Sequence, residues 1–330
     1  MILAGDIGGT KTQLALYGSA DLARRPARQQ RFASHDYASL EALALDFMAS
    51  AGNGPVTRAV FGIAGVVTKN RCETTNLPWH VDGAEVSRAL AGAKVTLLND
   101  LAATAEALDV LGPDDLDVLQ TGAPEPSVRA VLAAGTGLGM VASVRDGDRH
   151  VILPSEGGHA DFAPRNALED ELAAWLRARH GRASVEHVLS GRGLADIYRF
   201  LAATGRGAEP AGFDARFMGS PDPAALVSES ALDGSCERAR LALEMFIDAY
   251  GAEAGNLALR VLPIEGLYIG GGIAPKVRAA FHDGRFLAAF RNKPPMTDLA
   301  ARIPVALILD PHAPLWGAAR IALDSDGGDA

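Results

Sequence analysis

Residues 2–17 read Ile-Leu-Ala-Gly-Asp-Ile-Gly-Gly-Thr-Lys-Thr-Gln-Leu-Ala-Leu-Tyr, in which a glycine-rich stretch separates two short apolar runs. The apolar runs Ile2–Ala4 and Leu14–Tyr17 predict two β-strands, and the stretch between them predicts a tight connecting turn. Further apolar runs alternate with longer stretches of helical spacing along the chain. Val95–Leu98 is followed by the helical pattern Leu101–Leu111, and a second series of this kind begins with Val131–Ala134. This alternation of strand, polar turn and helix predicts an α/β fold.

The turn after the first apolar run carries residues suited to a phosphate group. Adjacent glycines, Gly8 and Gly9, tolerate unusual backbone angles and let amide groups approach an anion closely. Thr10 adds a hydroxyl donor, and Asp6 stands where a carboxylate could hold a hydrated Mg²⁺ beside phosphates. The alternative is an ordinary Gly-Gly hairpin turn, because glycine-rich turns are common.

Two further glycine-rich motifs follow apolar runs. Gly135-Thr136-Gly137-Leu138-Gly139 matches neither the P-loop spacing nor the dinucleotide-binding spacing. Two phosphate-type loops so far apart in the chain indicate a nucleotide held between two domains, although two unrelated turns would look the same. Gly270-Gly271-Gly272 follows Gly266–Ile269, and three residues without side chains would let a flat ring lie against the backbone. The alternative there is a tight turn before a helix that begins near Pro275.

The pair Asn99-Asp100 stands at the end of an apolar run. In open α/β sheets a carboxylate at the C-terminal end of a strand faces the ligand crevice. Either residue could instead cap the helix that follows, and the two roles are compatible.

The segment 156–161 combines acidic residues and a histidine around two glycines. Glu156 and His159 are three residues apart and could converge on a ligand with several hydroxyl groups. A zinc site is not indicated, because the H-E-x-x-H pattern is absent and no cysteine is nearby. A structural histidine is the common alternative. Glu186 alone indicates no more than a solvated residue.

The composition excludes several classes of protein. The 330 residues include 31 basic and 40 acidic side chains, for a net charge of −9, which argues against a protein that binds nucleic acid through charge. The 2 cysteines cannot form a disulfide framework or a cysteine-rich zinc site, so we expect a reducing cytoplasm. The start has no secretory signal pattern and no apolar run reaches about 18 residues, so we expect no membrane partner.

Three longer segments bear on domain organisation. Gly112–Asp115 is a polar Gly-Pro stretch and predicts the boundary between the two halves. Gly205–Asp222 is rich in Gly, Pro and Ala and predicts a surface excursion. Ser235–Leu262 has the apolar spacing of one long buried helix.

Taken together and in this order, the motifs resemble one family. The first two glycine motifs resemble the phosphate motifs of sugar kinases in the actin/hexokinase/Hsp70 superfamily, and the third resembles their adenosine motif. Other motifs resemble the bacterial ATP-dependent glucokinase family: Leu98-Asn99-Asp100, the stretch 154–164, Glu186-His187-Val188-Leu189-Ser190-Gly191 and Trp316-Gly317-Ala318-Ala319. The resemblance covers nearly the whole chain.

The resemblance implies an α/β fold of two ribonuclease-H-like, actin-like ATPase domains around an interdomain cleft. The small domain would be residues 1–110 plus 312–330, and the large domain residues 111–311. It also implies a homodimer, with glucose and ATP as partners and Mg²⁺ beside the ATP. A cysteine-rich zinc motif, which many related ROK sugar kinases carry, is missing here, so no structural zinc is expected.

Carried over by position, the resemblance also implies residue roles. Asp100 would be the general base on the sugar 6-hydroxyl, and Asp6 would organise Mg²⁺ through water. The residues expected at the sugar are Asn99, Asp100, Glu156, His159 and Glu186. Those expected at the nucleotide are Asp6, Gly8, Gly9, Thr10, Gly135, Thr136, Gly137, Gly270, Gly271 and Gly272.

The implied activity is ATP-dependent phosphorylation of D-glucose to glucose 6-phosphate. One alternative is a kinase for another hexose or for an amino sugar. The other is a sugar sensor of the same fold without turnover, against which Asp6 and Asp100 argue.

Overall fold

The computed structural model describes residues 1–18, 22–51, 54–74 and 77–324. The chain divides into two compact units: unit 1 is Met1–Asp115 with Asp310–Ala330, and unit 2 is Leu116–Leu309. The last residues of the predicted small domain, 325–330, lie outside the described residues.

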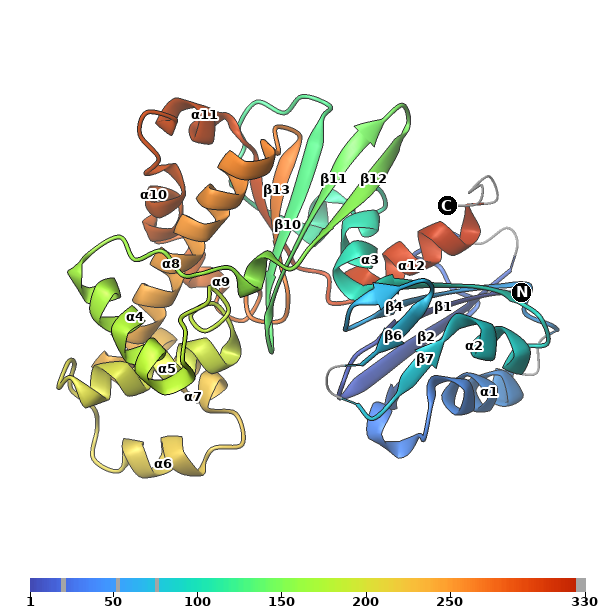
Figure 1. Ribbon diagram of the computed structural model, residues 1–330, viewed down its shortest axis with the longest axis horizontal. Helices are drawn as coiled ribbons and strands as arrows, with labels where there is room; N and C mark the ends of the chain where they lie inside the picture. The colour runs from blue at the N-terminus through green and yellow to red at the C-terminus, as the bar shows by residue number, and fades with distance from the viewer. Residues whose placement is uncertain (19–21, 52–53, 75–76, 325–330) are drawn as a thin grey trace. The chain divides into compact units, whose positions relative to one another are not determined.

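Unit 1 is built on a five-stranded sheet of order β3-β2-β1-β4-β8 (Figure 1). Its strands are β1 (Ile2–Ile7), β2 (Lys11–Tyr17), β3 (Arg28–Ala33), β4 (Arg58–Ile63) and β8 (Lys94–Asn99). Its α-helices are α1 (Leu40–Ala51), α2 (Gly83–Ala89), α3 (Asp100–Ala107) and α12 (Ala313–Leu323), with 3₁₀ turns η1 (Ser34–Asp36) and η2 (Pro113–Asp115). A small separate sheet contains β5 (Val67–Thr68), β6 (Arg71–Glu73) and β7 (His80–Asp82).

The two faces of this sheet are covered by different helices. Leu3, Leu14 and Phe61 are fully buried on the face that packs with α1 and α2. On the other face α12 lies across β1 and β4 and packs closely against α3. Gly62 faces that side, where a Cβ atom would lie 3.0 Å from the Cβ atom of Ala103. Because side chains alternate along a strand, Asp6 also points to the α12 side.

Unit 2 is built on a six-stranded sheet of order β12-β11-β10-β13-β14-β9. Its strands are β9 (Leu116–Gln120), β10 (Val128–Ala134), β11 (Leu138–Asp146), β12 (Arg149–Ser155), β13 (Gly266–Gly270) and β14 (Val305–Ile308). Its α-helices are α4 (Ala167–His180), α5 (Gly191–Ala203), α6 (Phe213–Gly219), α7 (Pro223–Leu232), α8 (Glu237–Val261), α9 (Arg278–Phe281), α10 (Arg285–Arg291) and α11 (Thr297–Arg302), with the 3₁₀ turn η3 (Gly157–His159).

Helix α8 forms the centre of the unit 2 core and packs with α5, α7 and α10 (Figure 1). Phe246 and Tyr250 of α8 are fully buried, and the ring of Tyr250 meets Phe286 of α10 edge to face. Gly251 allows the two helices to touch, because a Cβ atom there would lie 2.2 Å from the carbonyl oxygen of Phe286. The long helix predicted over Ser235–Leu262 is therefore confirmed, with slightly narrower bounds.

The predicted surface excursion Gly205–Asp222 is wrong in its middle part. The stretch contains α6, whose Phe213 and Phe217 are almost completely buried against Tyr198. Two aromatic anchors four residues apart give a short helix one apolar side, and that spacing was present in the sequence.

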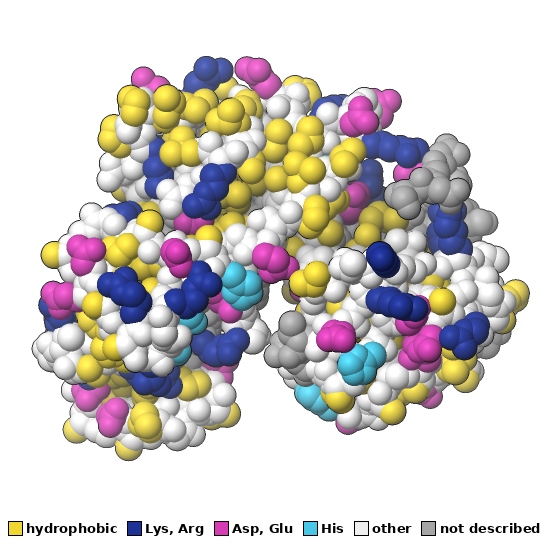
Figure 2. All heavy atoms as spheres, in the orientation of Figure 1, with side chains coloured by type: hydrophobic (Ala, Val, Ile, Leu, Met, Phe, Trp, Pro, Cys, Tyr) yellow, Lys and Arg dark blue, Asp and Glu magenta, His cyan; other side chains and the backbone are white. Residues whose placement is uncertain are grey.

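Figure 2 shows basic and acidic side chains interspersed on the visible face. Within residues 1–18, 22–51, 54–74 and 77–324, no helix combines the length and the apolar character that crossing a membrane requires.

Candidate functional site

The glycine-rich turn of unit 1 connects β1 to β2 and is fixed by a buried hydroxyl group. The amide of Gly8 donates to the carbonyl of Lys11 across the turn (3.0 Å). Ser34 is fully buried, and its Oγ donates to the carbonyl of Gly8 (2.8 Å). Its amide donates to the carbonyl of Thr10 (3.1 Å), and its Oγ lies 3.0 Å from Oγ1 of Thr12. The turn is therefore rigid where Gly8, Gly9 and Thr10 would meet a phosphate.

Asp6 is the last residue but one of β1, and its carboxyl group interacts with a second carboxylate. Burial, and to a lesser extent the negative charge of Asp100, together raise the pKa of Asp6 from an ordinary 3.8 to about 7. A cation beside these two carboxylates would relieve both effects. Carboxylate oxygens suit Mg²⁺, which proteins commonly hold by one or two carboxylates together with substrate phosphates. The residues present therefore fit Mg²⁺.

Among the described residues, no group of three His, Cys, Asp or Glu side chains could hold a metal ion on its own. A Mg²⁺ ion at Asp6 would accordingly need ligands from a bound phosphate and water.

Asn99 and Asp100 stand where β8 ends and α3 begins. Asn99 is the N-cap of α3: its Oδ1 accepts from the amides of Leu101 (3.0 Å) and Ala102 (3.3 Å), and its Nδ2 donates to the carbonyl of Gly65 (3.0 Å). The capping interpretation is thus confirmed for Asn99. Asp100 is half-buried at the first helical position, where the helix terminus favours a negative charge.

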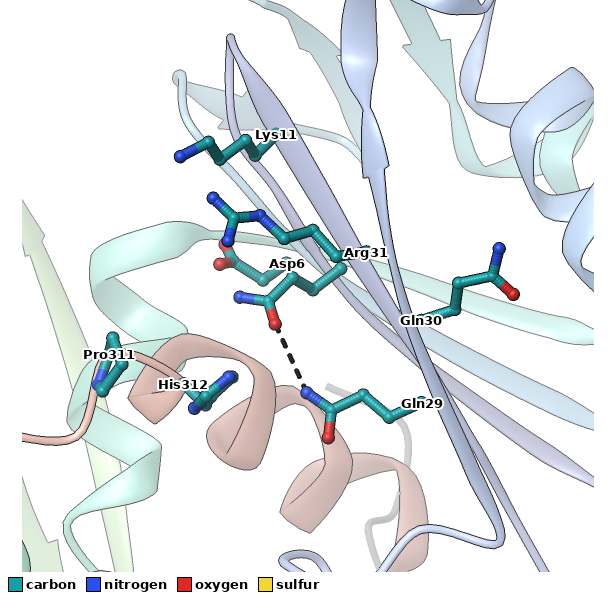
Figure 3. Close-up of a pocket in the computed structure, with 8 residues that line it drawn as sticks. Asp6, Lys11, Gln29, Gln30, Arg31, Pro311 and His312 are labelled. Carbon is teal, nitrogen blue, oxygen red and sulfur yellow. Dashed lines mark hydrogen bonds between the residues drawn. The ribbon is translucent and has the colours of Figure 1, made fainter.

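A pocket of about 650 Å³ opens beside Asp6 on the α12 face of the sheet. Figure 3 shows Asp6, Lys11 and Arg31 extending to one side of the sheet near the start of α12, whereas Gln30 points away. The residues that line it are Asp6, Lys11, Gln13, Gln29, Gln30, Arg31, Pro311 and His312. Four of them, Asp6, Lys11, Gln13 and Arg31, lie close together because β1, β2 and β3 pair in register.

The glycine-rich turn of unit 2 connects β10 to β11 and meets Glu186. The amide of Gly135 donates to the carbonyl of Gly137 (2.8 Å). Next to it, the amide of Leu138 donates to Oε2 of Glu186 (2.9 Å). A Cβ atom at Gly137 would lie 2.5 Å from the same oxygen, so only glycine leaves room for this carboxylate.

Glu186 also contacts the segment that carries two other predicted sugar-binding residues, Glu156 and His159. Its amide donates to the carbonyl of Gly158 (2.9 Å), in the middle of η3. Glu156 and His159 are exposed on either side of Gly158. The solvated-residue interpretation of Glu186 is therefore wrong, because its carboxylate and backbone join two distant segments of unit 2.

The third glycine motif lies beside the second. Strands β10 and β13 pair in parallel, with Ala133 opposite Gly270. Gly271 has a φ of 85°, and a Cβ atom there would lie 2.3 Å from the carbonyl oxygen of Ala134. The next helix, α9, begins only at Arg278, so the helix start considered near Pro275 is wrong.

Two further residues, Ser34 and Tyr250, support the turns and could not be predicted from the sequence. In the core of unit 2 the amide of Ala134 donates to Oη of Tyr250 (3.0 Å), which donates to the carbonyl of Leu132 (3.2 Å). Each supports the end of a strand that leads into a glycine-rich turn. Neither carried a local signal, because Ser34 and Tyr250 stand 26 and 116 residues from the backbone groups that they bind at Gly8 and Ala134.

Comparisons with known proteins find relatives along nearly the whole chain. A sequence model of the family described as Glucokinase matches residues 3–325. A glucokinase from Synechocystis sp. is 42% identical over 347 residues, and one from Nostoc punctiforme is 40% identical over 339 residues. Each alignment covers 98% of this chain and 98% of the relative. The crystal structure of a glucokinase from an Antarctic psychrotroph superposes with a TM-score of 0.84 at 33% identity, covering 98% of this chain and 99% of that one.

Proposed function

The chain belongs to the glucokinase family, and on that premise we propose that it transfers the γ-phosphoryl group of ATP to the 6-hydroxyl of D-glucose. The observation that carries the proposal is the position of Glu186. Its carboxylate binds the amide of Leu138 in a phosphate-type turn, and its backbone binds Gly158 between two predicted sugar ligands. These two bonds hold a predicted sugar-binding residue and a phosphate-type turn in one fixed arrangement.

Unit 2 contributes the hydroxyl-recognising groups in this proposal. The bond from Leu138 occupies Oε2 of Glu186 and leaves Oε1 to accept from a sugar hydroxyl. Glu156 and His159 are exposed and would bind further hydroxyls. Groups fixed in this way discriminate strongly, because a sugar with a missing or inverted hydroxyl leaves them unpaired.

Unit 1 contributes the base. Asp100 accepts the proton of the 6-hydroxyl as the new bond to phosphorus forms. Asn99 orients Asp100 by fixing the start of α3, and we place its amide at the edge of the sugar. The donor would supply the transferred phosphoryl group, and Mg²⁺, held by Asp6 through water, would balance negative charge on the phosphates.

The remaining predicted residues bind the donor. Their amides and hydroxyls would donate to phosphate oxygens, and the residues in this role are Gly8, Gly9, Thr10, Gly135, Thr136 and Gly137. Asp6 would hold Mg²⁺ through water, and the backbone at Gly270, Gly271 and Gly272 would accept the adenosine. We assign the two units to the small and large domains of this family.

A coupled assay of ADP release with MgATP tests the activity. The panel is glucose, mannose, galactose, fructose, N-acetylglucosamine and no sugar, with the phosphorylated position of the product read by ³¹P NMR. We expect release with glucose, little with galactose and almost none without sugar. Release with another sugar instead of glucose would change the assigned substrate and leave the proposed mechanism unchanged. Sugar binding by calorimetry without any release would support the sensor alternative and reject a kinase.

The family also implies a homodimer in the cytoplasm. Light scattering on the purified chain tests the dimer, and a monomer at micromolar concentration would contradict it.

A further inference from the structure

The pocket beside Asp6 contains two positive side chains that the predicted roles do not use. In the pairing of β1, β2 and β3, Asp6 stands opposite Gln13, and Gln13 stands opposite Arg31. Lys11 is two residues from Gln13 and therefore lies on the same face. One row across the sheet thus presents a carboxylate, an amide and a guanidinium group to the same pocket (Figure 3).

Arg31 and Lys11 are exposed and have no protein partner among the described residues, by either hydrogen bond or ion pair. Other arginines of unit 1 differ in this respect. Arg24 pairs with Asp115 (2.6 Å), and Arg71 pairs with Asp82 (2.8 Å). Two unpaired cations in one pocket of about 650 Å³ indicate an anionic ligand of more than one charge.

The chemistry of these groups selects a phosphate chain. A guanidinium group binds two phosphate oxygens at once through its planar fork, and an ammonium group binds phosphate as a point charge. A neutral hexose could accept hydrogen bonds from these two groups but would not balance their charge. In the proposed reaction the polyanion is the phosphoryl donor, whose phosphates would already lie at Gly8, Gly9 and Thr10, directly before Lys11 in the chain.

We propose that Arg31, with Lys11 beside it, binds the phosphate chain of ATP in this pocket. The inference rests on the proposed function for the identity of the donor. It makes β3, which lies at the edge of the sheet, part of the nucleotide site.

The test measures nucleotide binding directly. Titration calorimetry with MgATP, and with its non-hydrolysable analogue MgAMPPNP, is carried out on the full chain and on Arg31→Gln, Lys11→Gln and Arg31→Lys. We expect Kd for both nucleotides to rise about 10- to 100-fold in Arg31→Gln, because a charged hydrogen-bond donor is lost. Lys11→Gln should show a smaller rise, and Arg31→Lys should recover part of the affinity. Arg25→Gln is the matched control: it makes the same change of charge in unit 1 at an exposed residue that does not line the pocket.

Kinetics and product inhibition give two further readouts. In Arg31→Gln the KM for MgATP should rise while the KM for glucose stays within about twofold, and the affinity for MgATP should depend less steeply on salt. Unchanged MgATP binding in Arg31→Gln would overturn the inference and would indicate that Arg31 only protects an edge strand from pairing with another chain. Weaker inhibition by glucose 6-phosphate with unchanged MgATP binding would also overturn it, because the pocket would then hold the product phosphate.

These outcomes separate the inference from the proposed function. If the wild-type chain binds MgATP through Arg31 but phosphorylates no sugar, the inference stands and the kinase assignment fails. If the wild-type chain phosphorylates glucose and Arg31→Gln behaves like Arg25→Gln, the kinase assignment stands and the inference fails.

Discussion

Unit 1 and unit 2 share one arrangement of strands, in which an antiparallel three-stranded meander is followed by two parallel strands. The order is β3-β2-β1-β4-β8 in unit 1 and β12-β11-β10-β13-β14 in unit 2, where β9 is added at the edge. In both units a glycine-rich turn follows the first strand of the meander, which is β1 in unit 1 and β10 in unit 2. The last residue but one of that strand is Asp6 in unit 1 and Ala133 in unit 2. The same backbone plan therefore presents a carboxylate in one unit and a methyl group in the other.

The side chains around the two turns differ in a similar way, with more charged groups beside the turn of unit 1. In unit 1, Ser34 fixes the turn, and charged side chains occupy the face beside it. In unit 2, Tyr250 fixes the strand end, and the carboxylate of Glu186 is held by a backbone amide. In the proposed reaction, unit 1 would contribute groups that change or balance charge, and unit 2 would contribute fixed geometry. Substitutions of the unit 1 site residues should therefore alter the reaction rate and its pH dependence. Substitutions in unit 2 should lower activity by displacing the side chains that bind the sugar.

The largest effect is expected in unit 1, at Asp100. Asp100→Asn keeps the shape of the side chain and removes the base, so kcat for glucose should fall by about 10²–10⁴. Glucose binding, measured by calorimetry, should change little. Asp114→Asn is the matched control, since Asp114 is exposed in η2 of the same unit. A kcat within threefold of the wild type in Asp100→Asn would remove Asp100 from the chemical step.

The next effect tests whether unit 2 acts through geometry. Gly137→Ala places a methyl group 2.5 Å from Oε2 of Glu186 and must displace the carboxylate. We expect kcat/KM for glucose to fall about 10- to 100-fold, the effect of losing one oriented, charged hydrogen bond. A double-mutant cycle with Glu186→Ala gives the control. If the effect acts through Glu186, the double variant is no worse than Glu186→Ala alone, and additive losses would contradict this explanation.

The smallest effect concerns the charge at Asp6. Because the pKa of Asp6 is raised to about 7, its carboxyl group is increasingly protonated as the pH falls below 7. A protonated carboxyl group holds Mg²⁺ poorly, so the Kd for MgATP should rise by up to about tenfold per pH unit below 7. Asp6→Asn should bind MgATP weakly with a flatter pH profile, which also separates the titration of Asp6 from that of the nucleotide. Equal slopes in the two proteins would contradict the role of Asp6.

The ligand-free protein should show the opposite trend. A carboxyl group whose pKa is raised in the folded state stabilises the fold below its ordinary pKa of 3.8, and this contribution is lost as the pH rises towards 7. Thermal melts of the wild type and Asp6→Asn at pH 5 and pH 8 measure the difference. We expect no comparable pH-dependent change of stability from the corresponding strand end of unit 2, because Ala133 there takes the place of Asp6.

Local patterns in the sequence predicted much of the fold. The apolar spacing over Ser235–Leu262 predicted helix α8, and the capping interpretation of Asn99 holds at the start of α3. Such features depend on a few neighbouring residues. Strand β3 was missed because its residues are mostly polar and only Phe32 is buried. Its identity as a strand comes from its pairing with β2 and not from its own composition.

The candidate site was predicted less completely. The motifs named the glycines and carboxylates, but they could not show that Glu186 lies against Gly137, because the two are far apart in the chain. They also gave Asn99 a role at a ligand without showing that its amide is largely occupied by the backbone. Contacts of this kind depend on the tertiary fold, and a single sequence carries no signal for them.

Unit 1 is made of two pieces of chain, and this has a consequence for how the protein is synthesised. Helix α12 comes from the second piece and covers β1 and β4 with Leu315, Ala318 and Ala319, which are fully buried. On the ribosome, the sheet of unit 1 emerges first but must wait for all of unit 2 to be made, on the order of tens of seconds at about 5–20 residues per second. During that interval unit 2 can fold to completion, while the face of the unit 1 sheet that α12 covers remains exposed to solvent. A nascent chain would therefore finish its second unit before its first, and chaperones would meet the protein through its N-terminal sheet.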